Sequence, residues 1–507
     1  MGATLSAFVD LSLLNGARSI MRCAATTREE GEMSNTRTGQ THEHHKGQSS
    51  IRFVGTLFSL AFLVFGGCAS TEPTSSIDAA KSIEAAKKLC KVDTVIPNWN
   101  AVAQNALVAV AGLPIQRAEL WIAIMHASIY DAANSIGGRE GGFTQFAVTP
   151  TKRRPASRTA AAAQAGHDVL VHFLPAQQAR LDAALASSLA AVKDGIAKDN
   201  GKLIGAEVAA KMVTLHDGII PDVTYVYGPP DPGVYQKTPP AFAPALVPGF
   251  ALVTPFTMSS PSQFRVGPPP DLSSDTWVSD YNETKAYGQD TSAVRTAFQT
   301  ETGRFYTEHA VAQYNRAFRA LAAANGFTIG QNARFFAMAN LAIIDSQIAC
   351  WDSKYHYSFW RPSTALRAGG GNASLVADPT WLPLATTPAH PEYPAAHGCW
   401  TNATAEVLKA WFGTGAVNFS LSSTITNTTH NFTSTDDLQA EIIGARIYGG
   451  MHYRNSVVKG AEIGQQVVAN MLQNNFLPTD DDGDDSRDVG ACQADVDEQA
   501  SNSDDSL

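Results

Sequence analysis

Apolar residues recur at helical spacing along much of this chain. Residues 103–135 include the apolar-rich run ELWIAIMHASIYDAAN and stop short of Gly137 and Gly138, the residue type that commonly caps a helix C-terminus. Residues 159–193 are rich in alanine, and Pro175 divides them because proline does not fit inside a helix. The pattern predicts a helix that ends before the glycine pair and two further helices on either side of Pro175.

The helical signal continues beyond these segments. Leu181, Leu185 and Leu189 repeat every four residues and predict a buried stripe on the second alanine-rich helix. Helical patterning returns at 277–325 and at 331–354, whereas sustained alternation of the β type is scarce. The chain is therefore expected to have an all-α fold organised as a helical bundle.

Residues 221–270 interrupt this pattern. They hold 13 of the 26 prolines, so a long helix cannot run through them. They also carry more aromatic residues than a free linker would, namely Tyr225, Tyr227, Tyr235, Phe242, Phe250, Phe256 and Phe264. We expect a long Pro-rich excursion that is ordered, packs over the helical domain and could wall a pocket.

The composition is that of a globular protein, with 507 residues, 44% of them hydrophobic and 17% charged. The formal net charge is −10, and the segment from Asp480 onward accounts for all of it with eleven acidic residues and one arginine. No basic excess remains to neutralise phosphates, so nucleic acid is not an expected partner. The acidic segment has no hydrophobic period and is expected to be disordered.

One apolar run, Phe53–Phe65, has 13 residues, which is short for a bilayer span but suits the core of a signal peptide. Small residues before Cys68 resemble a bacterial lipoprotein cleavage box, and ordinary cleavage after Ala69 is the alternative. The protein is therefore expected to be exported, as a periplasmic, envelope-lipoprotein or secreted form, with membrane contact only through a lipid on Cys68. The expected organisation is a leader over 1–69, a linker over 70–93, a helical domain over 94–478 and an acidic tail over 479–507.

Three segments carry residues that bind anions. In the first, Lys354 and Arg361 lie seven positions apart, which is two helical turns and places them on nearly the same helix face. In the second, His397 lies at or near the start of a helix that continues as TNATAEVLKAWF. Free N–H groups and the helix dipole favour an anion at such a helix start.

In the third segment, Arg446 is expected to close one helix and His452 to open the next, with Gly449 and Gly450 between them. Ser456 follows His452 by one helical turn and could orient its ring. Each segment alone also fits an ordinary role, such as a snorkelling cation or a helix cap. Together, three fixed positive charges and two histidines suit an oxyanion such as phosphate or an analogue, with one histidine attacking or ligating the central atom.

The pattern Lys-x6-Arg-Pro, then Pro-x-x-His, then Arg-x5-His resembles the vanadium-dependent haloperoxidase branch of the type 2 phosphatidic acid phosphatase superfamily. The three blocks span residues 354–452 in the family's order, and the similarity extends over most of 94–476. This resemblance implies a pair of four-helix bundles and a site for vanadate, or for phosphate as the substrate group. It further implies that Lys354, Arg361 and Arg446 bind the oxyanion.

The same resemblance implies that His452 bonds vanadium, or is the phosphorylated nucleophile in a phosphatase, and that His397 is its acid–base partner. Two departures matter. The family's Pro-Ser-Gly-His is here Pro-Ala-Ala-His, so backbone N–H groups, that of Ala396 among them, would have to replace a serine hydroxyl. The family's aspartate four residues after the second histidine is here Ser456, which weakens the expected support of the His452 ring.

The leading functional hypothesis is an exported haloperoxidase that uses vanadate and hydrogen peroxide to oxidise a halide, with an organic molecule as the final acceptor. A phosphomonoesterase that acts through a phosphohistidine in the same site is the first alternative. A non-catalytic envelope protein that binds oxyanions is the second. A metal-hydrolase site is a weaker hypothesis, built on Asp345, Asp352, His356, His390 and Glu392.

The six cysteines show no Cys-x-x-Cys spacing, which argues against a zinc ribbon and a disulfide-dense scaffold. Cys350 and Cys399 flank the first and second blocks. If those blocks converge, an exported protein could join the two cysteines in a disulfide. Asp345 precedes Lys354 by nine residues and could support it.

Overall fold

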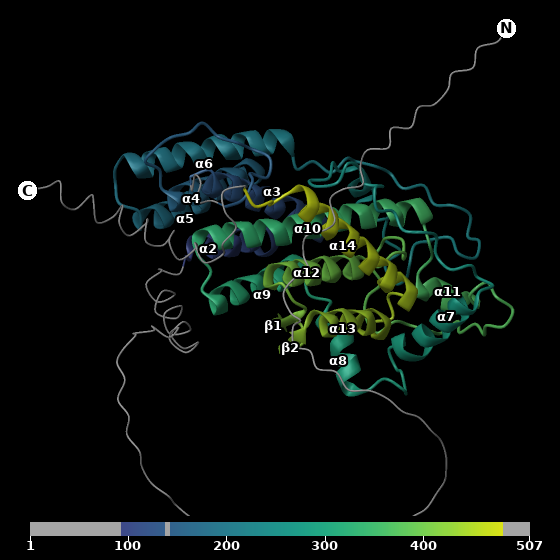
Figure 1. The fold of residues 1–507 in the computed structure, drawn as a ribbon. Coiled ribbons are helices and arrows are strands. Elements are labelled where there is room, and N and C mark those ends of the chain that lie inside the picture. Colours follow the sequence, from purple (N-terminus) through teal and green to yellow (C-terminus); the bar gives the residue numbers. More distant parts are fainter. Residues whose placement is uncertain (1–92, 137–141, 480–507) are drawn as a thin grey trace, which may run out of the picture. The chain divides into compact units, whose positions relative to one another are not determined.

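The computed structural model describes residues 93–136 and 142–479. The expected leader with Cys68, residues 70–92 of the expected linker and the acidic residues from 480 onward lie outside these ranges. Within them, helices predominate and two short strands form a single hairpin, which confirms the expectation of an all-α fold (Figure 1). No helix in these ranges is both long and apolar enough to cross a membrane.

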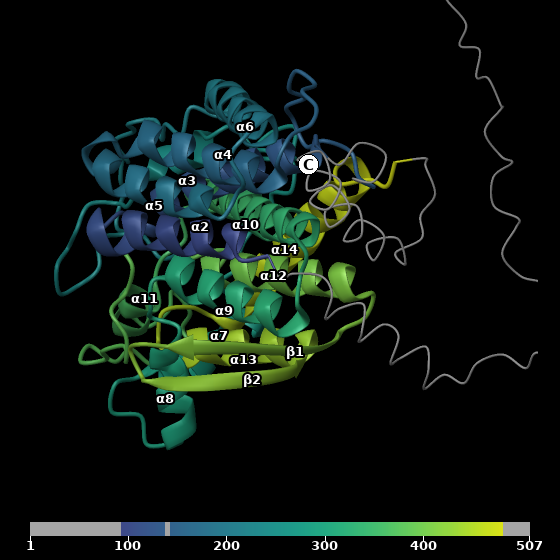
Figure 2. The same ribbon diagram turned by 90° about the vertical axis from the view of Figure 1, so that its left-hand side faces the viewer.

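The first group of helices packs around α3 and α4, with α6 against both of them and α5 against α4 (Figure 2). Pro114 immediately precedes α3, whose middle residues are buried on all sides. The elements of this group are α2 (Val95–Gln104), the π-helical turn η1 (Asn105–Val110), α3 (Ile115–Asn134), α4 (Arg158–Phe173), η3 (Pro175–Gln177), α5 (Gln178–Ala190) and α6 (Ile196–Leu215).

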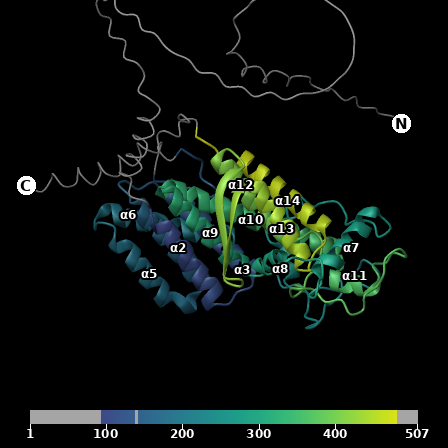
Figure 3. The same cartoon turned by 90° about the horizontal axis from the view of Figure 1, so that it is seen from below.

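The second group forms around the longest helix, α10 (Ile329–Tyr357), which also packs on α3 and so joins the two groups. Thr328 and Gln331 start α10 with a reciprocal capping box. The helices α12 (Ala396–Phe412) and α14 (Arg454–Asn474) pack on α10 and on each other, and α13 (Thr435–Tyr448) packs on both (Figure 3). The two groups match the pair of helical bundles that the resemblance implied.

Shorter elements complete the second group. They are η4 (Pro248–Leu252), α7 (Asp275–Gly288), α8 (Ala297–Phe305), α9 (Ala310–Asn325), α11 (Pro362–Ala368), β1 (Ala416–Ser423) and β2 (Thr428–Ser434). The antiparallel hairpin was not predicted, although β1 does alternate between exposed and buried positions. Its buried residues include Phe419 and Leu421, and β1 packs on α9.

The helix boundaries refine the expectations. Residues 103–135 do not form one helix, because η1 ends at Val110 and α3 begins only after Pro114. The expected division of residues 159–193 at Pro175 is confirmed. Of the expected leucine stripe on α5, only Leu181 is fully buried, while the other two leucines are partly exposed.

The Pro-rich segment 221–270 is ordered and packs on α10, as expected. The buried carboxylate of Asp345 accepts the backbone N–H groups of Phe256 and Thr257 at 2.8 and 2.6 Å. The Tyr355 hydroxyl donates to the Leu246 carbonyl oxygen at 2.6 Å. Asp345 therefore anchors this segment rather than supporting Lys354.

Glycines allow α12 and α14 to approach closely. Gly398 on α12 faces the backbone of Val457, and Gly460 on α14 faces the backbone of Ala395 and Cys399. A side chain at either glycine would meet backbone atoms of the opposite helix, which cannot rotate away. This close packing holds the start of α12, where His397 lies, against the start of α14.

Replacing Gly460 by alanine tests this contact. The added Cβ would lie 2.5 Å from the Ala395 carbonyl oxygen and 3.0 Å from the Cys399 amide nitrogen. We expect this overpacking to lower the free energy of unfolding by about 1–3 kcal/mol in urea denaturation. The matched control is Gly330→Ala on α10, where nothing lies within 4 Å of the added atom, and stability should stay level or rise slightly. Unchanged stability of G460A would contradict the close approach.

Candidate functional site

Arg361 lies at the centre of a buried polar cluster that brings the three predicted segments together. Its Nε donates to the His390 carbonyl oxygen at 2.8 Å, and one terminal nitrogen donates to the Met451 carbonyl oxygen at 2.8 Å. That same nitrogen lies 3.2 Å from Nε2 of His452, and the other lies 3.0 Å from Nδ1 of His390. The guanidinium is therefore fixed in direction by two backbone carbonyls and two imidazoles.

The expectation that Lys354 and Arg361 share a helix face was wrong. The helix α10 ends at Tyr357, and Ser358 takes a left-handed conformation with φ of 49°, which breaks the helical path. Arg361 instead occupies the N-cap position of α11, so its side chain enters the site from a different element. Both side chains are nevertheless fully buried and belong to the same cluster.

The ammonium group of Lys354 binds one short backbone segment. It donates to the carbonyl oxygens of Pro391 and Glu392 at 3.1 and 2.9 Å, and also to that of Pro394. These three contacts match the three N–H bonds of an ammonium group. Burial lowers the pKa of Lys354, and the neighbouring charge of Arg361 lowers it further.

His452 has a carboxylate partner that the sequence analysis did not assign to it. Its Nδ1 lies 2.8 Å from Oε1 of Glu392, which also accepts the Tyr453 backbone N–H at 3.1 Å. The hydroxyl of Ser456 donates to the other carboxylate oxygen at 2.6 Å. Ser456 thus acts on the His452 ring through Glu392, and not directly as expected.

Arg446 and His397 have nitrogens without partners. Arg446 lies in the last turn of α13, as predicted, and donates to the Tyr306 carbonyl oxygen at 3.3 Å and to the Met451 sulfur at 3.4 Å. Its Nε is buried and has no hydrogen-bond partner among the described residues. The same holds for Nε2 of His397, the second residue of α12. The His397 ring also contacts the backbone of Tyr306, the residue whose carbonyl oxygen accepts from Arg446, so both side chains meet at this residue.

The electrostatics of the cluster follow from burial among cations. Burial lowers the pKa of His452 well below its usual value, and Arg361, Lys354 and Arg446 lower it further. Burial, Arg446 and Lys354 do the same to the pKa of His397. Both imidazoles are therefore neutral at pH 7, which leaves each ring with one nitrogen lone pair.

The start of α12 differs from the expectation in its details. Ala395 is the N-cap of α12 and provides no side-chain cap, while its N–H donates to the Ser456 carbonyl oxygen at 2.9 Å. Ala396 is the first residue of the helix, and its carbonyl oxygen accepts the amide of Gln347 at 2.9 Å. His397 thus lies at the helix N-terminus, as predicted, and the N-cap alanine offers no hydroxyl.

Cys350 and Cys399 are close together but do not form the expected disulfide. Both are buried free thiols, and each interacts with the other. Cys350 donates to the carbonyl oxygen of Pro394, which also accepts from Lys354, and Cys399 donates to that of Ala395. The convergence of the two blocks is therefore confirmed, and the covalent link is not present.

The residues of the metal-hydrolase hypothesis do not come together. Asp345 binds the Pro-rich segment, Asp352 pairs with Arg265 at 2.6 Å, and His356 is exposed. Only His390 and Glu392 lie in the cluster around Arg361. In the described ranges, no group of three or more His, Cys, Asp or Glu side chains could hold a metal ion.

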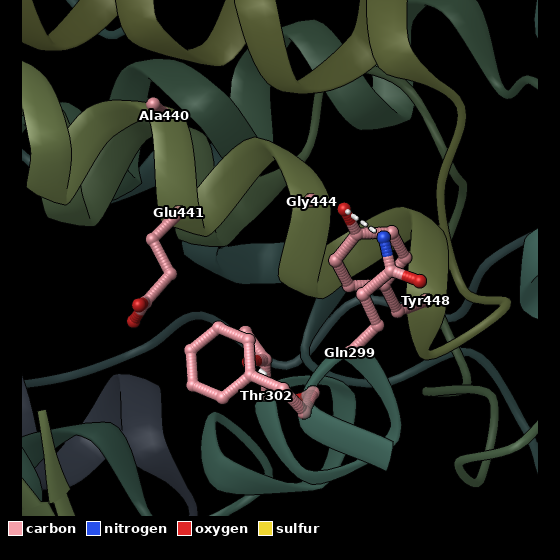
Figure 4. Close-up of a pocket in the computed structure, with 7 residues that line it drawn as sticks. Gln299, Thr302, Ala440, Glu441, Gly444 and Tyr448 are labelled. Carbon is pink, nitrogen blue, oxygen red and sulfur yellow. Dashed lines mark hydrogen bonds between the residues drawn. The ribbon is translucent and has the colours of Figure 1, made fainter. Parts of the chain in front are cut away.

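A separate surface pocket of about 320 Å³ lies between α8 and α13 (Figure 4). The Gln299 amide donates to the Tyr448 hydroxyl at 3.2 Å on one side of it, and the carboxylate of Glu441 lies apart from that pair. None of the predicted site residues is among the seven that line this pocket. It is therefore distinct from the cluster around Arg361.

Part of this chain is similar in sequence to known proteins. Residues 334–476 match the family model described as the VCPO second helical-bundle domain. The vanadium chloroperoxidase of Curvularia inaequalis is 29% identical over 90 residues, which cover 16% of this chain and only 14% of that protein.

Solved structures share the fold over a longer range. A bacterial vanadium-dependent iodoperoxidase aligns with a TM-score of 0.62 at 19% identity, covering 79% of this chain and 98% of its own. A holo-type bacterial vanadium-dependent chloroperoxidase aligns with a TM-score of 0.57 at 16% identity, covering 72% of this chain and 94% of its own. These structures confirm the fold, while the match of residues 334–476 to the family model supports the resemblance that the three sequence blocks indicated.

Replacing Lys354 by methionine tests its contacts with residues 391–394. The methionine keeps much of the side-chain volume but removes the charged donor from three buried carbonyl oxygens. That of Glu392 then has no other donor among the described residues, while that of Pro394 keeps the Cys350 thiol. We expect the free energy of unfolding to fall by about 2 kcal/mol or more, measured by chemical denaturation. The control Lys459→Met removes a surface pair with Glu462 and should change stability by less than about 0.5 kcal/mol. Equal stabilities of the two variants would show that Lys354 does not hold this segment.

Proposed function

We propose that the buried cationic cluster of this chain, most of which lies in the residues that match the VCPO second helical-bundle domain, binds vanadate and oxidises a halide with hydrogen peroxide. The observation that carries this proposal is the pair of buried nitrogens without a partner among the described residues, Arg446 Nε and His397 Nε2, beside the buried cations. A bound oxyanion would accept a hydrogen bond from Arg446 Nε and would lie next to Nε2 of His397. It would also offset the positive charge of the buried cations. The donor set therefore fits a vanadate group.

The three cations would contribute in different ways. Arg446 can donate further hydrogen bonds, because only two of its five N–H groups have a partner in the described ranges. Arg361 is fixed by the carbonyl oxygens of His390 and Met451, so its terminal nitrogens point in a set direction. The ammonium group of Lys354 donates its three hydrogen bonds to backbone carbonyl oxygens, so Lys354 would act on the anion through its charge. This division replaces the simpler expectation that all three bind the anion directly.

The two histidines would have different roles. Nε2 of His452 points at the Arg361 guanidinium, which places its lone pair inside the cluster, where it could bond the central atom of the anion. His397 lies at the N-terminus of α12, and its buried Nε2 faces no protein partner in the ranges described. That nitrogen can take a proton from an oxygen of the bound group and, once protonated, can return it.

When bound, vanadate supplies a Lewis acid that activates hydrogen peroxide toward a halide. The chain would contribute the rest. Arg446 and Arg361 would stabilise the negative charge of the bound group, His397 would transfer the proton, and burial would exclude bulk water. The final acceptor would be a small organic molecule. Because bound vanadate would activate the peroxide, the proposed reaction needs no haem or flavin.

A phosphomonoesterase remains the second candidate, and one observation favours it. A carboxylate on Nδ1 of a neutral histidine, as Glu392 is on His452, strengthens the histidine as a nucleophile. In that reaction, Nε2 of His452 would attack phosphorus as the bond to the ester oxygen breaks. The negative charge of the bound phosphate would raise the pKa of His397, and His397, protonated in that complex, would give its proton to the leaving oxygen. The same cations would stabilise the equatorial oxygens in either reaction.

Assays on the full chain separate these functions. The protein is incubated with orthovanadate and tested for bromide oxidation by hydrogen peroxide, and in parallel, without vanadate, for hydrolysis of p-nitrophenyl phosphate. We expect His452→Ala and Arg446→Gln to lower bromide oxidation by about 10²–10³-fold, because each removes a ligand or donor of the anion. Arg454→Gln is the matched control, since Arg454 pairs with Glu283 outside the cluster. Its rate of bromide oxidation should stay within about twofold of the wild-type rate.

Each result has a distinct meaning. Ester hydrolysis without bromide oxidation would replace the leading proposal by the phosphatase. Vanadate binding without either turnover would indicate an oxyanion-binding protein. Wild-type bromide oxidation by His452→Ala would remove His452 from the site.

A further inference from the structure

The resemblance drawn from the sequence implies an aspartate four residues after the second histidine, and this chain has Ser456 there. The structure supplies a carboxylate from elsewhere in the chain. Glu392 precedes His452 by sixty residues and lies on the segment that leads into α12. Its Oε1 lies 2.8 Å from Nδ1 of His452, while Ser456 binds the other oxygen at 2.6 Å.

We propose that Glu392, anchored by Ser456, is the positioning residue of His452 and fixes the tautomer that the site requires. This inference rests on the proposed function of His452 as the residue that meets the bound anion. It goes beyond that function by naming the group that orients the ring, which comes from the segment before α12 and not from position 456.

The partners of the imidazole assign its tautomer. Arg361 can only donate hydrogen bonds, so Nε2 of His452, 3.2 Å from its terminal nitrogen, acts as the acceptor. The one proton of the neutral ring is then on Nδ1, which donates to the Glu392 carboxylate. With the proton held on the far side of the ring, the lone pair on Nε2 faces the cations.

Glu392 is itself fixed from several directions. Its backbone N–H donates to the Phe359 carbonyl oxygen at 2.9 Å, and its own carbonyl oxygen accepts from Lys354 at 2.9 Å. Its side chain is fully buried, and both carboxylate oxygens are occupied by Tyr453, His452 and Ser456. A carboxylate held this firmly can set the plane of the imidazole ring as well as its tautomer.

A simpler role for Glu392 would be to balance the charges of Lys354 and Arg361 by its presence alone. Glu392→Asp separates the two roles. The shorter side chain keeps a negative charge among the cations but cannot reach Nδ1 from the same backbone position. Positioning therefore predicts that E392D behaves like Glu392→Gln, whereas charge balance predicts that E392D behaves like the wild type.

The experiment uses the full chain labelled with ¹⁵N-histidine, and the His452 signals are assigned by their loss in His452→Gln. We expect the wild type to show a protonated Nδ1 and an unprotonated Nε2, and E392D and E392Q to lose this single-tautomer pattern. The dissociation constant for orthovanadate should rise by about 10–100-fold in both variants. Glu283→Gln, which removes the surface partner of Arg454, is the matched control and should change neither readout.

A rescue completes the test. Glu392→Gln combined with Ser456→Asp places a carboxylate four residues after His452, in the first turn of α14, and should restore the tautomer pattern and bring the vanadate affinity back to within about threefold of wild type. If the Glu392 variants do not fold, Ser456→Ala alone removes the anchoring hydroxyl and should mix the tautomers. Wild-type tautomer signals in both E392D and S456A would overturn the proposal. A wild type that binds no vanadate would refute the proposed function, and the NMR signals would still decide the role of Glu392.

Discussion

The ammonium group of Lys354 takes its acceptors from three carbonyl oxygens within residues 391–394, and the positions of both site histidines depend on this contact. Hydrogen bonds from a charged donor are stronger than neutral ones, and a buried carbonyl without a donor is costly. The segment therefore has one favourable arrangement. That arrangement directs the Glu392 side chain to His452 and leads directly into α12, which carries His397.

The cluster holds more positive charge than its protein partners neutralise. Lys354, Arg361 and Arg446 are all buried, and Glu392 is the carboxylate in hydrogen-bond contact with the cluster. Burial lowers the pKa of each of the three cations, which means that the fold destabilises their charged forms. Buried charges are normally paired, so a surplus of this kind is typical of a site that is completed by an anion. The nitrogens of Arg446 and His397 that have no partner among the described residues are a second sign of such a site.

Much of this site could be predicted from the sequence, because the spacing of cations and histidines is local within each block. Lys354, Arg361, His397, Arg446 and His452 were all identified, and the structure gathers the segments that carry them. The shared helix face of Lys354 and Arg361 was wrong, because a left-handed Ser358 is not visible in a helical period. The hairpin was missed for a similar reason, since β1 and β2 are short and gain their stability from packing on α9 and α13.

Glu392 shows where local reasoning ends. Its sequence neighbours give no sign that it faces His452, because that contact depends on the turn before α12, on Lys354 and on the close packing of two helices. An acid at position 456 would orient the ring from the first turn of α14, the helix that begins just after His452. Glu392 instead joins the segment before α12 to the segment before α14, so the geometry of His452 is coupled to the placement of His397. A carboxylate at position 392 therefore does more than replace a missing residue, because the segment that carries it contacts His452 and also leads into the helix of His397.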